Sequence, residues 1–354
     1  MRGAGAAATV CGAALLLAGA GGCRGAGAEP DPRGAAAVAA MKQLLDGRLG
    51  EWQTAARDLR QAAPVPTDRG WDAQRDAAAI TAMKDAWGHA RAAYERVEGA
   101  VAPLFPESDT ATDARYDHFL TVAGAAGDRD PFDGEGVIGM HAIERILWSD
   151  SIPATVVEFE RVLPGYHPAR FPATPAEAAS FKDGLAARLV ADVERLRADF
   201  RPLQPDAAFT YRGLVDLAIE QAEKLNKASS GEEESRYAQT TMRDLRANIA
   251  GCREAYQLFR PWVSSSPAGA AADARVMKAF ARLEAAYRQV PGDALPKPPE
   301  TWSSVSPRPA DLATPFGTLF TVVKREVEPA APGSLVNALG EVAGVLGLPA
   351  AILR

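Results

Sequence analysis

The sequence contains only three cysteines in 354 residues and has no cluster of lysine or arginine residues. Its net charge is −6, which argues against the basic surface that nucleic-acid binding requires, so no nucleic-acid partner is expected. Aromatic residues make up only 7% of the chain, whereas alanine is abundant throughout. Because alanine favours helices and aromatic residues favour strands, this composition predicts helices rather than strands.

Familiar catalytic motifs are also missing. The sequence has no His-Glu-x-x-His zinc-protease signature, no phosphate-binding P-loop and no Gly-x-Ser-x-Gly nucleophile motif. Cys252 lies between Gly251 and Arg253, which form no recognisable nucleophile motif, so we interpret it as a buried packing residue. The sequence therefore offers no specific group for catalysis, and we lean towards a protein that is not an enzyme.

Residues 1–22 have the pattern of a secretory signal peptide. Arg2 is followed by a weakly apolar stretch and then by small residues, and the segment is too short and too rich in glycine to span a membrane. Cys23 resembles the lipid-modified cysteine of a bacterial lipobox, although Ala20 stands where the usual pattern has leucine. We therefore expect an exported lipoprotein tethered through residues 23–33, with cleavage by an ordinary signal peptidase as the alternative.

From residue 34 onward, apolar residues recur with helical spacing between loops. The clearest repeat runs from residue 80 to residue 101 and indicates one helix of an antiparallel bundle. Residues 174–177 form a capping box with proline at the first helical position, which predicts a long helix that reaches Phe200. Residues 155–159 have strand character, but a single run cannot form a sheet.

The predicted fold class is therefore all-α, with helices packed as bundles. We place an N-terminal bundle over residues 34–204 and a C-terminal bundle over residues 205–354. The signal peptide and tether precede both bundles.

Two pairs of polar residues stand out against this helical background. His141 and Glu144 are three residues apart in a helix predicted over residues 137–148, so their side chains share one face. Imidazole and carboxylate at this spacing can bind a metal ion or form a simple hydrogen bond, and the motif alone is weak. Glu95 and Glu98 have the same phase relative to the apolar stripe of the preceding helix. Both pairs therefore lie beside a core-facing seam.

If the two helices pack together, one imidazole and three carboxylates converge. Carboxylates three residues apart repel each other, and a cation between them reverses that cost. The alternative is that Arg91 pairs with Glu95, four residues later, on an ordinary helix surface. Asp117 in the intervening acidic loop is our choice for a further oxygen ligand, with Asp113 behind it. Such a set of ligands suits iron, manganese or zinc.

The same segments resemble a known family. Residues 139–148 resemble the Gly-x-His-x-x-Glu signature of the imelysin family, once classed as metallopeptidases, which includes the periplasmic proteins of Efe-type iron-uptake systems. Residues 94–98 resemble the Glu-x-x-Glu segment of the Efe branch, and residues 113–117 resemble its acidic loop. Residues 232–251 resemble the second helix pair of the family. The resemblance covers most of the chain from about residue 38.

The resemblance implies an imelysin-like fold of two helical bundles with a metal site in the N-terminal one. Carried over by position, four side chains are ligands: Glu95, Glu98, Asp117 and His141. Glu144 is either a further ligand or a partner that holds one. Ala142 departs from the Efe pattern, because many Efe-type members have arginine at this position.

The function implied is metal capture without turnover. The resemblance points to a periplasm-facing lipoprotein that binds iron, or else zinc or manganese, for a membrane iron permease or another Efe-type component. Two alternatives stay open. One is a metal-dependent peptidase of the imelysin type, and the other is a non-catalytic surface scaffold lipoprotein.

Overall fold

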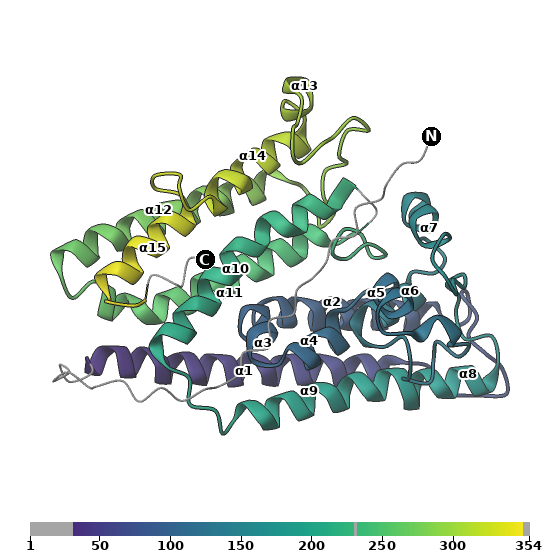
Figure 1. Cartoon of the computed structure of the whole chain (residues 1–354). Coiled ribbons are helices and arrows are strands. Elements are labelled where there is room, and N and C mark those ends of the chain that lie inside the picture. Colours follow the sequence, from purple (N-terminus) through teal and green to yellow (C-terminus); the bar gives the residue numbers. More distant parts are fainter. Residues whose placement is uncertain (1–30, 230–231, 350–354) are drawn as a thin grey trace. The chain divides into compact units, whose positions relative to one another are not determined.

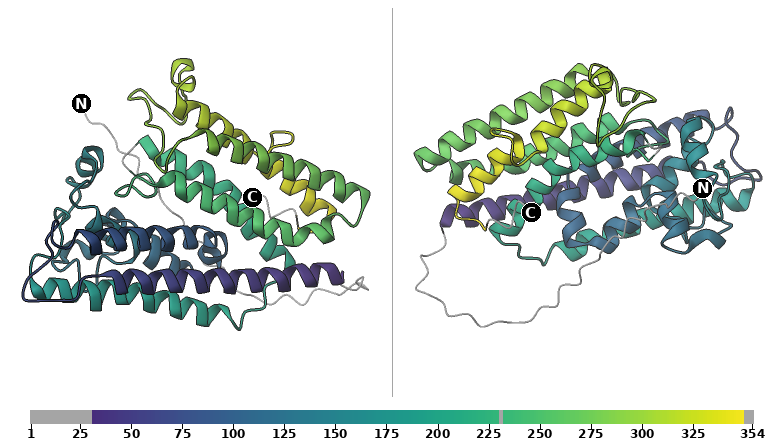
Figure 2. Two further views of the ribbon diagram at one scale, coloured as in Figure 1. Left: turned by 180° about the vertical axis from the view of Figure 1, so that it is seen from behind. Right: turned by 45° about the horizontal axis from the view of Figure 1, so that its top comes forward.

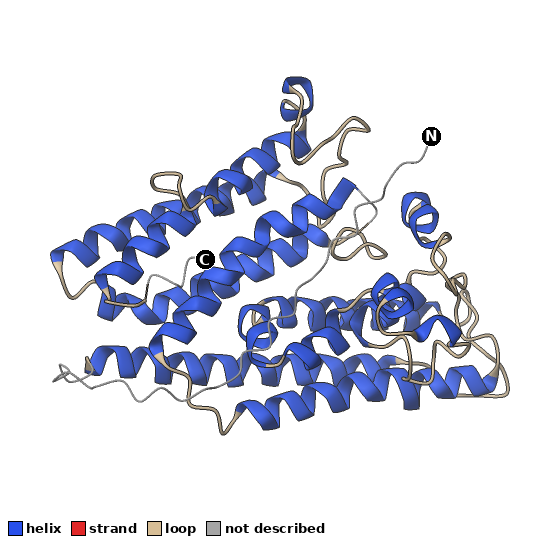
Figure 3. Cartoon of the chain, in the orientation of Figure 1, coloured by secondary structure: helices blue, strands red, loops and turns tan. Residues whose placement is uncertain are grey.

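Helices form all the regular secondary structure of the described residues, 31–229 and 232–349 of the computed structural model (Figure 1, Figure 3). The predicted all-α class is therefore confirmed. The signal peptide predicted over residues 1–22 and the lipid anchor predicted at Cys23 lie outside the described residues. Within the described ranges, no helix combines the length and the apolar character that crossing a membrane requires.

The N-terminal half consists of three long helices, α1, α2 and α9, and several short ones. Their bounds are α1 (Pro32–Ala62), α2 (Ala77–Glu95), α3 (Glu98–Leu104), α4 (Pro106–Asp113), α5 (Tyr116–Thr121), α6 (Gly139–Leu147), α7 (Ala154–Glu160), α8 (Pro175–Ser180) and α9 (Ala186–Phe200). A short 3₁₀ turn, η1 (Ala125–Gly127), and a π-helical segment, η2 (Phe181–Leu185), complete this half.

The C-terminal half contains longer and more regular helices. Their bounds are α10 (Ala207–Asn226), α11 (Thr241–Val263), α12 (Pro267–Gln289), α13 (Pro309–Leu312), α14 (Pro315–Val327) and α15 (Leu335–Val345), and the 3₁₀ turn η3 (Lys227–Ser229) follows α10. Helices α12, α14 and α15 pack against one another, as both views of Figure 2 show. Cys252 on α11 is fully buried, as the sequence predicted.

Buried apolar residues form two clusters. The first involves α1, α2 and α9 and includes Trp52, whose ring centroid lies 5.1 Å from that of Tyr94. The second involves α10, α11, α12, α14 and α15. Helix α1 contributes to both, with Met41 in the second cluster and Leu49 in the first. The domain boundary that we placed at residue 204 stays a prediction.

The helix predicted over residues 80–101 is interrupted between the two predicted metal ligands, Glu95 and Glu98. Helix α2 ends at Glu95, and α3 begins at Glu98. Gly251 on α11 packs against this break so closely that a Cβ atom there would lie 2.4 Å from the carbonyl oxygen of Arg96. Any larger residue would push α11 away from the turn that carries the two glutamates.

The long helix predicted to end at Phe200 also departs from regularity. Its start is as expected, because the Thr174 hydroxyl accepts the backbone N–H of Glu177 at 3.2 Å. The π-helical turn η2 then separates α8 from α9. Within η2, the backbone N–H of Leu185 donates to the carbonyl of Phe132 in a distant loop at 3.1 Å. This bond outside the helix gives a physical reason for the wider turn.

The run with strand character, residues 155–159, lies inside helix α7. A lone strand has no partner for its backbone groups, whereas a helix satisfies them internally. The strand tendency of this run is therefore overridden.

Candidate metal centre

Gly139 places the start of helix α6 against the end of helix α4. Its φ angle is +84°, which favours glycine. A Cβ atom at this position would lie 2.5 Å from the carbonyl oxygens of Ala111 and Thr112. This close approach brings His141, two residues after Gly139, beside Asp113 at the end of α4. The glycine of the Gly-x-His-x-x-Glu signature therefore has a local structural role.

The imidazole of His141 is buried and oriented. Its side chain is only 1% exposed, and its Nδ1 lies 2.6 Å from Oε2 of Glu144. Because a carboxylate accepts here, Nδ1 carries a proton, and Nε2 holds the lone pair in the neutral ring or a second proton in the imidazolium. Nε2 has no hydrogen-bond partner and lies 3.3 Å from Oδ1 of Asp113. The ring thus presents a buried nitrogen to the carboxylate of Asp113.

Glu144 has both carboxylate oxygens engaged. While Oε2 faces His141, Oε1 accepts the backbone N–H groups of Tyr237 at 3.0 Å and Ala238 at 2.8 Å. The carboxylate is fully buried. Glu144 therefore holds the imidazole from one side and the segment before α11 from the other. This geometry corresponds to a residue that positions a ligand.

Glu234, in the segment between η3 and α11, completes a group that fits a metal ion. One ligand atom from each of Asp113, His141 and Glu234 lies within 4.8 Å of the other two. Ligands at about 2.1 Å from a common metal lie about 3–4 Å apart, so a small inward movement would suffice. Glu234 is nearly fully buried, whereas 16% of the Asp113 side chain is exposed. Solvent therefore reaches the group on the Asp113 side.

Both carboxylates of this group are ionised. Burial opposes ionisation of Asp113, but Arg91 and His141 more than offset this and hold its pKa below the ordinary value. Burial likewise opposes ionisation of Glu234, but Arg115, Lys224 and Arg91 hold its pKa well below the ordinary value. Two carboxylates therefore lie near Nε2 of the imidazole, together with the cations that hold them ionised.

The pKa of His141 reflects the same surroundings. Burial lowers the pKa of the imidazole, and the carboxylates of Asp113 and Glu144 outweigh this effect, so the net shift is upward. The site thus favours a positive charge at this point, which either a proton or a metal ion can supply.

Glu95 and Glu98, the predicted ligands on the preceding helix, face the ammonium group of Lys224. Nζ of Lys224 lies 3.2 Å from Glu95 and 3.0 Å from Glu98, and the Asn248 side chain donates to both. Burial raises the pKa of Glu95 to about 8 and that of Glu98 well above its ordinary value. Among the described residues, the group within 4.8 Å of His141 contains neither glutamate. Their role as ligands stays a prediction.

Asp117, the preferred loop ligand, forms an ion pair with Arg236. Asp113, which ranked behind it, is the aspartate that lies next to His141. The helix break at Ala114 separates the two aspartates, since Asp113 ends α4 and Asp117 belongs to α5. Glu234 was not predicted as a ligand, because no spacing connects it to His141 across the intervening sequence. Its place in a segment that resembles the family was the only signal.

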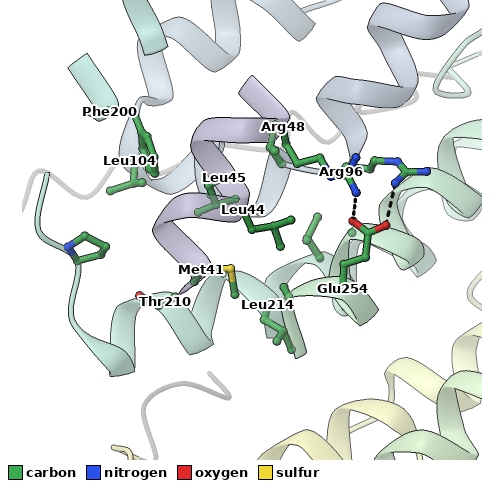
Figure 4. Close-up of a pocket in the computed structure, with 18 of the residues that line it drawn as sticks. Met41, Leu44, Leu45, Arg48, Arg96, Leu104, Phe200, Thr210, Leu214 and Glu254 are labelled. Atoms are coloured by element: carbon green, nitrogen blue, oxygen red, sulfur yellow. Dashed lines mark hydrogen bonds and ion pairs between the residues drawn. The ribbon is translucent and has the colours of Figure 1, made fainter. Parts of the chain in front are cut away.

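A separate cavity lies away from this group (Figure 4). It has a volume of about 40 Å³, and its lining is almost entirely apolar, with Met41, Leu104 and Leu214 among the lining residues. Three charged residues also line it, and among them Glu254 accepts from Arg48 at 2.7 Å and from Arg96 at 2.9 Å. The charged groups of this small and mostly apolar space pair with one another, so none of them is available for chemistry. The group around His141 is therefore the stronger functional candidate.

Comparison with known proteins identifies a related family. The family model described as imelysin, which carries a peptidase label, matches residues 47–307, well over half of the chain. Asp113, His141 and Glu234 all lie within the matched region. No curated protein matches the sequence.

Proposed function

This chain belongs to the imelysin family, and on that premise we propose that it captures a metal ion at Asp113, His141 and Glu234. The observation that carries this proposal is the convergence of the buried Nε2 atom of His141 with the carboxylates of Asp113 and Glu234, Oδ1 of Asp113 lying 3.3 Å from Nε2. A metal ion at this point would take the place of the proton that otherwise links the imidazole to Asp113. The orientation of the imidazole by Glu144 supports the same conclusion.

The chemistry of the ligands narrows the choice of metal. Two carboxylates and one imidazole suit iron, manganese or zinc, and they are unsuitable for Cu(I), which prefers sulfur. Three protein ligands leave coordination positions for water or for a small molecule that arrives with the metal. We propose iron as the cargo, with zinc and manganese as the alternatives.

Capture without turnover fits the site better than peptide hydrolysis. A metallopeptidase needs a carboxylate that is free to accept a proton from the attacking water. Glu144 is adjacent to His141, but both of its oxygens are engaged by His141, Tyr237 and Ala238. The family's peptidase label therefore stays the alternative to test.

The proposed location follows from the sequence pattern before α1. We propose that the protein is exported, anchored through a lipid at Cys23, and faces the periplasm. There it would pass its metal to a membrane iron permease or another Efe-type component.

The decisive experiment is calorimetric titration of the purified, metal-free protein with Fe(III), Fe(II), Mn(II) and Zn(II). We expect one equivalent to bind, and His141→Ala to weaken binding by about a hundredfold or more, because a ligand is lost. His89→Ala, which removes an exposed histidine from α2, is the matched control and should leave affinity unchanged. Absence of binding in the native protein, or equal affinity in the two variants, would disprove the proposal.

The peptidase alternative makes a different prediction. Incubation of the metal-loaded protein with a peptide library should yield no cleavage under the proposal. Cleavage that disappears in both His141→Ala and Glu144→Gln would establish the peptidase instead.

A further inference from the structure

Arg91 on helix α2 lies between the carboxylates of the proposed metal centre. Its side chain is fully buried. One terminal nitrogen, Nη1, contacts Oδ1 of Asp113, and the other, Nη2, lies 2.6 Å from Oε1 of Glu234. A guanidinium keeps its charge at any pH at which the protein is folded. Arg91 thus pairs with two of the three candidate ligands, Asp113 and Glu234, and shares Glu234 with Arg115 and Lys224.

The contacts of Arg91 involve an atom that a metal ion would need. Oδ1 of Asp113 faces both Nη1 of Arg91 and Nε2 of His141. Oε1 of Glu234 is likewise held by Nη2. A metal ion placed between these oxygens and the imidazole would lie next to a fixed positive charge in a buried environment, where charges repel strongly. The guanidinium and the metal ion therefore cannot both occupy their best positions.

A second position for the guanidinium lies close by. Nη2 of Arg91 is already 2.5 Å from Glu95, one turn further along α2. Nε of Arg91 and Oδ1 of Asp244 are both buried, both lack a hydrogen-bond partner, and lie 3.9 Å apart. A small shift towards α11 would let Arg91 bond to Asp244 while it keeps Glu95. The carboxylate of Asp244 is held in place for this, because its other oxygen accepts the Ser235 hydroxyl at 2.5 Å.

We propose that Arg91 is an internal competitor of the metal ion, which leaves Asp113 and Glu234 for Asp244 when the metal binds and returns when the metal leaves. This inference rests on the proposed function and specifies how the site releases its cargo. A site with two carboxylates and an oriented imidazole tends to hold its metal tightly. The return of Arg91 neutralises the vacated carboxylates and so favours release to the next carrier.

The test compares metal affinity and release in Arg91 and Asp244 variants of the full mature chain, with Zn(II) as the probe and a chelator to follow dissociation. We expect Arg91→Met to bind Zn(II) at least tenfold more tightly than the native protein and to release it more slowly. Asp244→Asn should bind several-fold more weakly, since the displaced guanidinium loses a negatively charged acceptor and keeps only a neutral amide oxygen. Arg282→Met removes the ion pair between Arg282 and Glu326, which lies outside the site. This control variant should leave the Zn(II) affinity unchanged.

The double variant separates this exchange from simple electrostatics. If Arg91 moves to Asp244, the effect of Asp244→Asn must disappear in the Arg91→Met background, whereas loss of one nearby negative charge would act equally in both backgrounds. Equal or weaker Zn(II) affinity in a folded Arg91→Met protein would overturn the inference, because Arg91 would then only position the carboxylates. If Arg91→Met does not fold, unchanged affinity in Asp244→Asn would overturn it.

The two proposals fail in different ways. A native protein that binds no metal would reject the proposed function. A native protein that binds metal but shows none of these Arg91 effects would reject the exchange alone.

Discussion

Oε1 of Glu144 accepts a hydrogen bond from the backbone N–H of Tyr237, which lies 93 residues further along the chain. The other oxygen of the same carboxylate holds Nδ1 of His141. Tyr237 follows Glu234 by three residues, so Glu144 fixes the segment that carries one candidate ligand and orients the ring of another. Changes at Glu144 should therefore affect the metal centre without removing a ligand.

Replacement of Glu144 by glutamine should separate positioning from ligation. An amide has one acceptor oxygen, so it cannot accept from His141 and from the backbone N–H groups of Tyr237 and Ala238 at once. We expect metal affinity to fall about 10–100-fold, as is typical when a partner of a histidine ligand is lost. We also expect a loss of stability of about 1–3 kcal/mol, because buried donors lose their acceptor. Titration calorimetry and chemical denaturation measure the two effects.

Nitrogen NMR of the histidine ring provides the readout that a purely structural role would not change. The native protein should show a proton on Nδ1 of His141, and Glu144→Gln should alter that signal. Glu177→Gln, which removes a carboxylate from the distant cap of α8, should alter neither the signal nor the metal affinity. An unchanged His141 tautomer together with unchanged affinity in Glu144→Gln would contradict the assigned role.

The approach of α6 to α4 at Gly139 gives a second prediction. Gly139→Ala places a methyl group 2.5 Å from two backbone carbonyl oxygens and forces alanine to a φ angle of +84°. We expect a loss of stability of about 3 kcal/mol or more, since clash and backbone strain add. Displacement of α6 should also move His141 away from Asp113 and weaken metal binding.

A second glycine isolates the contribution of the clash. Gly124 has a φ angle of +77°, and a Cβ atom there would meet nothing within 4 Å. Gly124→Ala should therefore cost only the strain of about 1–2 kcal/mol and leave metal affinity intact. If thermal melts show that the two variants are equally destabilised, helix α4 moves to make room for the methyl group added at Gly139.

Local patterns predicted the elements of this fold better than the contacts between them. The capping box at Thr174 and the helical phase of His141 and Glu144 depend on residues within one or two turns, and both appear as expected. The break between Glu95 and Glu98 was not predictable from periodicity, because the apolar spacing continues through it to Val101. What distinguishes this turn is the close approach of Gly251, a contact made by a helix far along the sequence.

The residues that make up the metal centre were also not predictable from local sequence patterns alone. Arg91 was considered as a partner of Glu95, and the pair is present at 2.5 Å, but it is buried rather than on a helix surface. The same guanidinium also reaches Asp113 and Glu234, which no spacing could reveal. Lys224 lies in a helix to which the sequence assigned no special role, yet it faces both Glu95 and Glu98. Partners from distant helices therefore decide which carboxylates are available to a metal.

Asp109 on α4 gives a prediction on pH and stability for the metal-free protein. Burial, followed by the nearby charge of Asp113, raises the pKa of Asp109 to about 6, while the Tyr94 hydroxyl donates to its carboxylate. The folded protein therefore keeps a proton that the unfolded chain loses near pH 4. Between about pH 4 and pH 6 the folded state binds more protons, so the contribution of Asp109 to stability falls as pH rises and is constant above that range.

Asp109→Asn should remove this dependence, because an amide has no charge to bury and its oxygen still accepts from Tyr94. At pH 4 the variant and the native protein should be about equally stable, whereas at pH 7 the variant should be more stable by on the order of 1–2 kcal/mol, a value reduced for partial solvent exposure. Urea denaturation at the two pH values measures the difference. If the stability difference is the same at both pH values, Asp109 is ionised in the folded protein at little cost. If the variant is less stable than the native protein at pH 7, the Tyr94 hydroxyl also prefers the carboxylate to the amide.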